Sequence, residues 1–255
     1  MFNAGNNSPF GGGFGRGGFG GRRGGFSSRY QYQQVAPGYA NAETASSLIS
    51  KVMGLLAFSF LFAFLGALAG VAIALPYNAT FIVFIGGFIV LIALNFAINK
   101  PGINIFLLYL FTFLEGLGLA PLISLYLAVG YGNILGEAFL ITAVTSFGLA
   151  AYAWTTKRDF SGLGSKLFLG LILLLVASLV SIFFHSTFFI FLICVAGVGL
   201  FSAYLLYYVQ RAKYMADTLP NAIGLTVSIF ITVLNLFIYI LYILTILQGG
   251  SRNNR

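Results

Sequence analysis

Long apolar runs separated by short polar turns dominate the pattern of hydrophobic and polar positions along the chain. Seven such runs lie near residues 52–75, 79–98, 103–128, 135–154, 165–184, 188–210 and 221–247. Each has about 20 residues or more, so a helix rising about 1.5 Å per residue can cross a hydrocarbon layer of about 30 Å. The short turns make neighbouring helices antiparallel and leave no room for a soluble domain. The pattern predicts an all-α integral membrane protein with seven transmembrane helices within residues 45–248.

The two ends of the chain have a different composition. Eleven glycines fall between Gly5 and Gly25, mixed with phenylalanine and arginine. Such a segment buries too little apolar surface to offset its backbone entropy, so residues 1–44 are expected to form a disordered tail. Arginine–glycine tracts can bind nucleic acid, but a flexible basic tail near anionic headgroups is favoured, and no nucleic-acid partner is expected. Residues 249–255 are expected to form a short C-terminal tail.

One of the first polar side chains after the N-terminal segment is expected to cap the first helix. The candidates are Thr44, Ser46 and Ser47, because their hydroxyl groups can accept from backbone N–H groups of the first helical turn.

Composition and charge support a membrane location. Hydrophobic residues make up 59% of the chain and charged residues 7%, whereas soluble domains carry about 25% charged residues. The lipid bilayer is therefore the first expected partner. Lysine and arginine occupy the N-terminal segment and alternate turns: Lys51, Lys100, Lys157, Arg158, Lys166, Arg211 and Lys213. The positive-inside rule places these turns and the N-terminus in the cytoplasm and the C-terminus outside, although Arg252 and Arg255 would favour a re-entrant last segment.

Glu115 stands near the middle of the third run, so it falls near the bilayer midplane. A charge there costs on the order of 3 kcal/mol. Two interpretations follow: Glu115 belongs to an ion or proton pathway, which is favoured, or it is a neutral acid that joins helices. Calcium prefers six to eight oxygen ligands, so one glutamate cannot form a tight site, although permeation requires only weak coordination.

The seventh run carries a stripe of polar side chains. Ser228 and Thr232 are four residues apart and Asn235 follows three further on, while Thr226 lies nearby. The stripe either faces a pore or forms hydrogen bonds between helices. Small residues at Gly66-x-x-x-Gly70, Gly86-Gly87 and Gly197-x-Gly199 predict close approach of helices.

The remaining polar residues give no catalytic or metal-binding pattern. Cys194 and His185 are each the only residue of their kind, which excludes an internal disulfide and makes no metal-ligand spacing. His185 is expected in a solvated turn, and Glu137 is expected to meet the positive end of the fourth helix. No nucleophile–histidine–acid set and no phosphate-binding loop occurs, so no enzyme, cofactor or metal is expected.

Four stretches carry a family resemblance. They are Thr155-Thr156-Lys157-Arg158-Asp159-Phe160-Ser161 with Gly164, Glu115-Gly116-x-x-Leu119-Ala120-Pro121, Phe201-Ser202-Ala203-Tyr204 with Tyr207 and Gln210, and Asn221-Ala222 followed by Asn235-Leu236-Phe237. Over about residues 48–247 the chain resembles the Bax inhibitor-1 family, including its bacterial YccA-like branch. The resemblance implies six helices around a central seventh, a location in the plasma (inner) membrane, a pH-sensitive calcium leak and a link to a membrane-bound AAA+ quality-control protease.

The resemblance also implies a pH latch of two aspartates, one in the sixth helix and one in the seventh. Tyr208 and Thr232 stand at these positions, and neither titrates near neutrality. The coupled titration of two close carboxylates is therefore expected to be absent. Tyr208 is expected to be an anchor at the membrane interface in preference to a pore residue.

Three functional hypotheses follow. The first is a membrane protein that mediates or regulates a leak of cations, calcium among them, without the di-aspartyl latch. The second is a regulatory partner or substrate of a membrane-bound AAA+ protease. The third is recruitment of a cytosolic partner by the N-terminal tail.

Overall fold

A computed structural model describes residues 42–184 and 186–252, with side chains described for 46–184 and 186–248. Its helices are α1 (Ala42–Ala72), α2 (Tyr77–Ala97), α3 (Ile103–Ala128), α4 (Gly132–Thr155), α5 (Gly164–Phe184), α6 (Thr187–Ala212) and α7 (Leu219–Arg252), with a short 3-10 turn, η1 (Ser161–Leu163), before α5. All seven α-helices are long and apolar enough to cross a membrane, and the described residues contain no β-strand. The predicted seven-span all-α class is confirmed.

The helix ends differ from the predicted ones mainly at the two termini of the bundle. α1 begins at Ala42, so Thr44, Ser46 and Ser47 lie inside the helix and the predicted cap is wrong. α7 continues to Arg252, so residues 249–252 of the predicted C-terminal tail are helical. Hydropathy marks where a helix leaves the hydrocarbon, and a helix can continue beyond that point into water. Residues 1–41 of the predicted tail and His185 lie outside the described residues.

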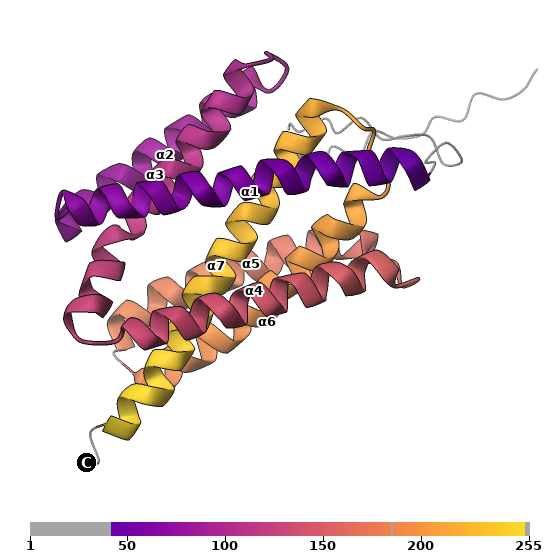
Figure 1. The fold of residues 1–255 in the computed structure, drawn as a ribbon. Helices are drawn as coiled ribbons and strands as arrows, with labels where there is room; N and C mark the ends of the chain where they lie inside the picture. The colour runs from indigo at the N-terminus through magenta and orange to yellow at the C-terminus, as the bar shows by residue number, and fades with distance from the viewer. Residues whose placement is uncertain (1–41, 185, 253–255) are drawn as a thin grey trace, which may run out of the picture. The chain divides into compact units, whose positions relative to one another are not determined.

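α7 occupies the central position that the resemblance implies. It packs against α1, α4 and α6 along much of its length and against α3 over a shorter stretch (Figure 1). α2 packs on α3, and α5 packs on α6; within the described residues the backbones of α2 and α5 do not approach α7 closely, although the side chain of Ser178 on α5 forms a hydrogen bond with Tyr239 on α7. α7 therefore lies between two groups of helices. The first group is α1, α2 and α3, the second is α4, α5 and α6, and α2 and α5 are the outer helices.

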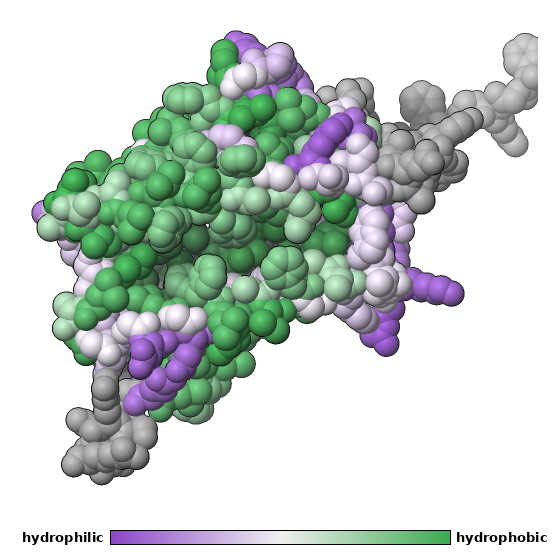
Figure 2. Space-filling view, viewed as in Figure 1, coloured by the Kyte–Doolittle hydropathy of each residue, from purple (hydrophilic) through white to green (hydrophobic). Residues whose placement is uncertain are grey.

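Apolar side chains fill the interior and also cover the outside of the bundle. Phe230 of α7 is fully buried, with its ring centroid 6.1 Å from that of Phe111 and 5.3 Å from that of Phe60. On the outside, Phe81 is 72% exposed and Phe183 is 80% exposed. Hydrophobic side chains cover most of the visible face (Figure 2). A surface of this kind is stable against lipid tails and unstable against water.

Glycines bring α1 and α3 into backbone contact. A Cβ atom at Gly116 would lie 1.8 Å from the carbonyl oxygen of Ala63, and one at Gly66 would lie 2.1 Å from that of Phe113. A Cβ atom at Gly70 would lie 2.4 Å from Cβ of Ala120. Only glycine permits these distances, so the close approach predicted from Gly66 and Gly70 is confirmed.

For each of the other two glycine pairs, the predicted close approach of helices is confirmed at one glycine and wrong at the other. Gly197 lies against the ring of Tyr239, 2.7 Å from where its Cβ atom would stand, and Gly87 lies against α3. Gly86 and Gly199 have nothing within 4 Å of an added Cβ atom. One glycine of each pair therefore serves helix contact.

Candidate functional site

Glu115 lies in the middle of α3 and faces α2. Neighbouring residues of α3 point to different helices, so that Gly116 meets α1 while the half-buried Glu115 meets α2. A Cβ atom at Gly87 of α2 would lie 3.2 Å from Oε1 of Glu115. Glu115 forms no hydrogen bond or ion pair with any described residue. The site is a carboxyl group inside a span, beside a glycine and without a polar partner.

The polar side chains of α7 use their donors within α7. Oγ of Ser228 donates to the carbonyl of Gly224 at 2.9 Å, and Oγ1 of Thr232 donates to the carbonyl of Ser228 at 2.7 Å. Nδ2 of Asn235 donates to the carbonyl of Ile231 at 2.8 Å. Thr226 bonds to the carbonyl of Ala222 in the same way. The oxygens of these side chains accept no hydrogen bond from a described residue, and Thr226 and Thr232 are buried.

The structure does not join Glu115 to the α7 stripe. α3 meets α7 through apolar groups, chiefly the rings of Phe111 and Phe230. Within the described part of the chain, no hydrogen bond connects Glu115 with Ser228, Thr232 or Asn235. The candidate residues therefore form two separate groups, one on α3 and one on α7.

Tyr208 packs inside the bundle. Its ring stacks on Tyr204 at 5.7 Å and meets the edge of Tyr207 at 5.4 Å, and it contacts both hydrophobic clusters of the interior. The predicted role of Tyr208 as an anchor at the membrane interface stays a prediction, and its aromatic neighbours could not be read from the sequence. Thr232, at the other latch position, is buried.

A buried glutamine, Gln210, which the sequence marks only as part of a family motif, holds the turn between α4 and α5. The amide of Gln210, 4% exposed, accepts from the backbone N–H of Phe160 and donates to the backbone carbonyl of Arg158. One side chain thus satisfies a donor and an acceptor of a chain segment 50 residues away. A lone amide in the buried face of α6, close in sequence to a basic helix end, was the available signal.

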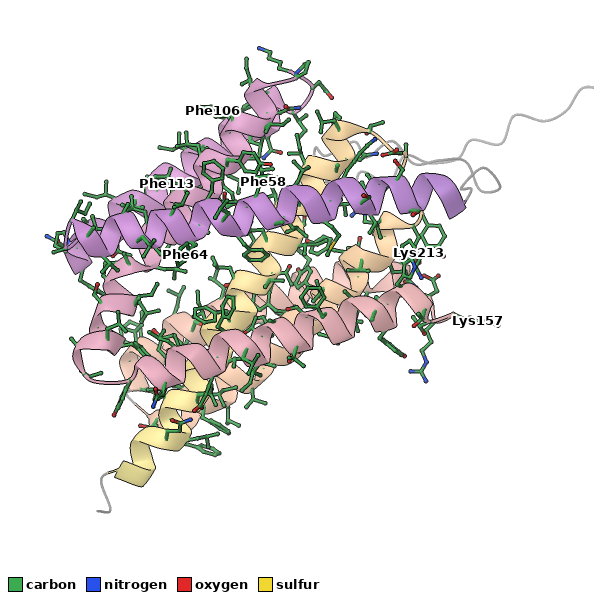
Figure 3. All side chains as sticks on the ribbon, viewed as in Figure 1. Phe58, Phe64, Phe106, Phe113, Lys157 and Lys213 are labelled. Carbon is green, nitrogen blue, oxygen red and sulfur yellow. The ribbon has the colours of Figure 1, made fainter. Side chains whose placement is uncertain are left out.

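The same end of the bundle holds two further cationic contacts. Nη1 of Arg211 donates to the hydroxyl of Tyr207 at 3.1 Å, and the start of α5 fits against this ring because a Cβ atom at Gly164 would lie 3.0 Å from the same hydroxyl. Nζ of Lys213 donates to the backbone carbonyl of Trp154 and lies 5.3 Å from the centre of its indole ring. Burial lowers the pKa of Lys213. Figure 3 shows Lys213 and Lys157 at this end, which we call the basic end.

An ion pair ties α1 to the turn between α6 and α7 at the basic end. Nζ of Lys51 lies 2.9 Å from Oδ1 of Asp217 and 3.0 Å from Oδ2. Hydrogen bonds from Lys51 and then Ser47 lower the pKa of Asp217 below its usual range. Nδ2 of Asn221 donates to the carbonyl of Ala216 and orders the same turn.

Asp217→Asn is expected to lower the free energy of unfolding by at most about 1 kcal/mol, because the pair is partly exposed. The pKa of Asp217 is depressed in the folded state, so the contribution is present above the unfolded pKa and is lost as pH falls through the folded pKa. Unfolding in detergent at about pH 7 and about pH 3 tests this, since the difference between wild type and variant should be smaller at the lower pH. A difference of equal size at both values would contradict it.

The opposite end of the bundle has its own polar contacts to α7. The hydroxyls of Tyr126 and Thr245 lie 2.7 Å apart, and Nε2 of Gln248 donates to Oε2 of Glu137 at 2.6 Å.

The expectation that Glu137 meets the positive end of α4 is wrong. α4 begins at Gly132, and no acidic residue lies in its first turn.

The comparisons with known proteins identify the family. A family model described as inhibitor of apoptosis-promoting Bax1 matches residues 45–249. The chain belongs to the Bax inhibitor-1 family. The four motif stretches all lie within the matched range, so the resemblance drawn from them is confirmed. As a member of this family, the protein is a multi-pass membrane protein.

Bacterial relatives of the family match most of the chain. An uncharacterized protein of Helicobacter pylori is 34% identical over 198 residues, which are 76% of this chain and 84% of the relative. An uncharacterized protein of Pseudomonas aeruginosa is 32% identical over 222 residues, covering 87% of this chain and 99% of the relative. An uncharacterized membrane protein of Vibrio cholerae is 35% identical over 144 residues, covering 56% of this chain and 64% of the relative.

Proposed function

We propose that this Bax inhibitor-1 family protein lets cations, calcium among them, leak across a bacterial inner membrane, with Glu115 as the charged group of the pathway. The observation that carries the proposal is the unpartnered carboxyl inside α3. Placing a charge at the bilayer centre costs on the order of 3 kcal/mol unless water, a partner or an ion compensates it. No described side chain bonds to Glu115, so the carboxyl must either bind a proton or be compensated by water or a passing cation, and a cation pathway supplies the latter two.

We propose that the α7 stripe supplies neutral oxygens at a second point of the pathway, separate from Glu115. The donors of Ser228, Thr232 and Asn235 are occupied within the helix, so each side chain offers oxygen lone pairs to a cation. Neutral oxygens bind calcium weakly compared with carboxylates. Weak binding at several positions suits permeation, because the ion must leave each site.

Orientation follows from the basic residues. The basic end, with Lys157 and Lys213, faces the cytoplasm together with the N-terminus, and the C-terminal end of α7 lies outside. Labelling of single cysteines in intact cells tests this. A cysteine at Lys157 should be inaccessible to a membrane-impermeant thiol reagent, and one at Gly130 should react.

The leak is expected to lack a two-aspartate latch, since Tyr208 and Thr232 occupy the corresponding positions. A coupled carboxylate pair titrates in two steps. Flux measured between about pH 6 and 8 should follow at most one titrating group, because Glu115 is the one acid within the described spans of α2 to α7 that lies away from their ends. A steep profile requiring two protons would contradict this.

Glu115→Gln in liposomes tests the proposal. The neutral amide keeps the shape of the side chain but loses the charge, so cation flux should fall about tenfold or more. Glu137→Gln, which removes an exposed acid at the opposite end of the bundle, is the matched control and should keep wild-type flux. Gly87→Ala places a methyl group 3.2 Å from Oε1 and should reduce flux partly. Flux that is absent in wild type would overturn the proposal.

Partnership with a membrane-bound AAA+ protease is the alternative that the resemblance supports. It predicts a protein without catalytic activity of its own. Deletion of residues 1–41 should then abolish association with the protease and slow turnover. Unchanged association and turnover would count against this alternative.

A further inference from the structure

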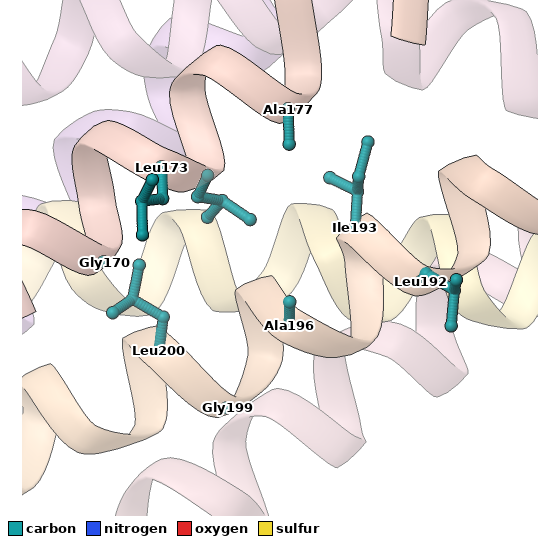
Figure 4. Close-up of a pocket in the computed structure, with 9 residues that line it drawn as sticks. Gly170, Leu173, Ala177, Leu192, Ile193, Ala196, Gly199 and Leu200 are labelled. Carbon is teal, nitrogen blue, oxygen red and sulfur yellow. The ribbon is translucent and has the colours of Figure 1, made fainter. Parts of the chain in front are cut away.

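A groove runs between α5 and α6 on the outside of the bundle. It encloses about 520 Å³ and is lined mainly by Gly170, Leu173 and Ala177 of α5 and Ile193, Ala196 and Leu200 of α6. Figure 4 shows the side chains of the two helices facing each other across this space. We call it the α5–α6 groove.

Small residues create the groove. Ala177 on α5, and Ala196 and Gly199 on α6, stand where larger side chains would fill the space. A Cβ atom at Gly199 would meet nothing within 4 Å. The helices touch at one end, where a Cβ atom at Gly170 would lie 2.8 Å from Cδ1 of Leu200. The lining holds no charged or hydrogen-bonding side chain, so water in the groove would have no polar partner.

The groove opens towards lipid. α5 and α6 both span the membrane, and Leu173 is 61% exposed and Leu192 46% exposed on this face. Hydrocarbon chains are the medium against such a face. We propose that the α5–α6 groove binds one acyl chain of an anionic phospholipid whose headgroup lies at Lys166. This proposal does not rest on the proposed cation leak.

Lys166 selects the headgroup. It precedes Gly170, Leu173 and Ala177 by four, seven and eleven residues, so all four residues share one face of α5. Along the helix axis Lys166 lies about 6 Å from Gly170, at the end of the span where headgroups begin. It is exposed and forms no ion pair with a described residue.

A second cation belongs to the same end of the groove. Arg211 follows Leu200 by eleven residues on α6, which places it on the same helix face, and its guanidinium lies at the hydroxyl of Tyr207. A lysine or arginine near the surface contributes about 1 kcal/mol of attraction to anionic lipid. Phosphatidylglycerol should therefore bind more tightly than phosphatidylcholine, although an acyl chain of either lipid fits the groove.

Native mass spectrometry of the purified full-length protein tests the proposal, with dioleoyl phosphatidylglycerol and dioleoyl phosphatidylcholine as probes. Wild type should bind one phosphatidylglycerol, and Lys166→Gln should weaken this binding about fivefold and leave phosphatidylcholine unchanged. Lys157→Gln, an exposed lysine of the neighbouring turn, is the matched control and should keep the preference. Ala196→Phe should fill the groove and weaken binding of both lipids.

Three outcomes would overturn the proposal. If Ala196→Phe leaves lipid binding unchanged, the lipid binds outside the groove. If Lys157→Gln also loses the preference for phosphatidylglycerol over phosphatidylcholine, the preference comes from general attraction to the basic surface. A wild-type dimer that Ala196→Phe converts to monomer means that a second copy occupies the groove. If Ala196→Phe does not fold, phosphatidylglycerol with a photoreactive acyl chain in wild-type vesicles decides: adducts concentrated in residues 170–177 and 192–200 support the proposal, and adducts spread evenly over the outer helices contradict it.

Discussion

Gly116→Ala is expected to lower the free energy of unfolding by about 3 kcal/mol. The added Cβ atom would lie 1.8 Å from the carbonyl oxygen of Ala63 and 2.6 Å from its carbonyl carbon. These are backbone atoms and cannot move as the end of a flexible side chain would. α1 and α3 must therefore separate along their whole contact, which weakens the dispersion contacts that hold spans together in lipid.

Unfolding of the purified protein by SDS in mixed micelles measures this effect. Gly86→Ala on α2 is the matched control, because nothing lies within 4 Å of its added Cβ atom. It should unfold at the same SDS fraction as wild type or a higher one, since alanine favours helix over glycine by about 1 kcal/mol. Equal stability of Gly116→Ala and Gly86→Ala would show that α1 and α3 do not pack as described.

Gln210→Ala is expected to release the turn between α4 and α5 and to lower stability by about 2 kcal/mol. The variant leaves the N–H of Phe160 and the carbonyl of Arg158 without their partner. A buried donor or acceptor without a partner costs about 1–3 kcal/mol, and water can compensate part of this because Arg158 is exposed. The turn should then open more often.

Limited trypsin digestion reads out this opening, because the turn contains Lys157 and Arg158. Cleavage there should be faster in Gln210→Ala than in wild type. Gln210→Glu keeps an acceptor for Phe160 but loses the donor to Arg158, so it should also cleave faster. Gln248→Ala, which removes the exposed contact with Glu137 at the opposite end, should cleave at the wild-type rate. The same rate in all variants would show that Gln210 does not hold the turn.

The seven spans could be predicted because their length and apolar composition reflect the thickness of the bilayer. The close approach at Gly66 and Gly70 could also be predicted, since small residues four apart share a helix face. The start of α1 at Ala42 could not, because its polar first turns lie beyond the apolar run that defined the span.

Which side of each spanning helix packs against its neighbours was harder to predict than the presence of the helix. In a soluble helix the apolar stripe marks the core, but here the outer face of α2 carries Phe81 and the outer face of α5 carries Phe183. Apolar side chains cover both sides, so the pattern does not show which neighbour a residue meets. The sequence therefore located Glu115 in depth, whereas its orientation towards Gly87 and away from the α7 stripe required the structure.

Calcium entry into liposomes that contain wild-type protein or Glu115→Gln, reported by a trapped fluorescent indicator, tests the central claim most directly. Calcium entry above that of empty liposomes is expected for wild type and for Glu137→Gln, with a loss of about tenfold or more for Glu115→Gln. Entry at the wild-type rate in a folded Glu115→Gln protein would contradict it, because the carboxyl of α3 would then have no part in the pathway.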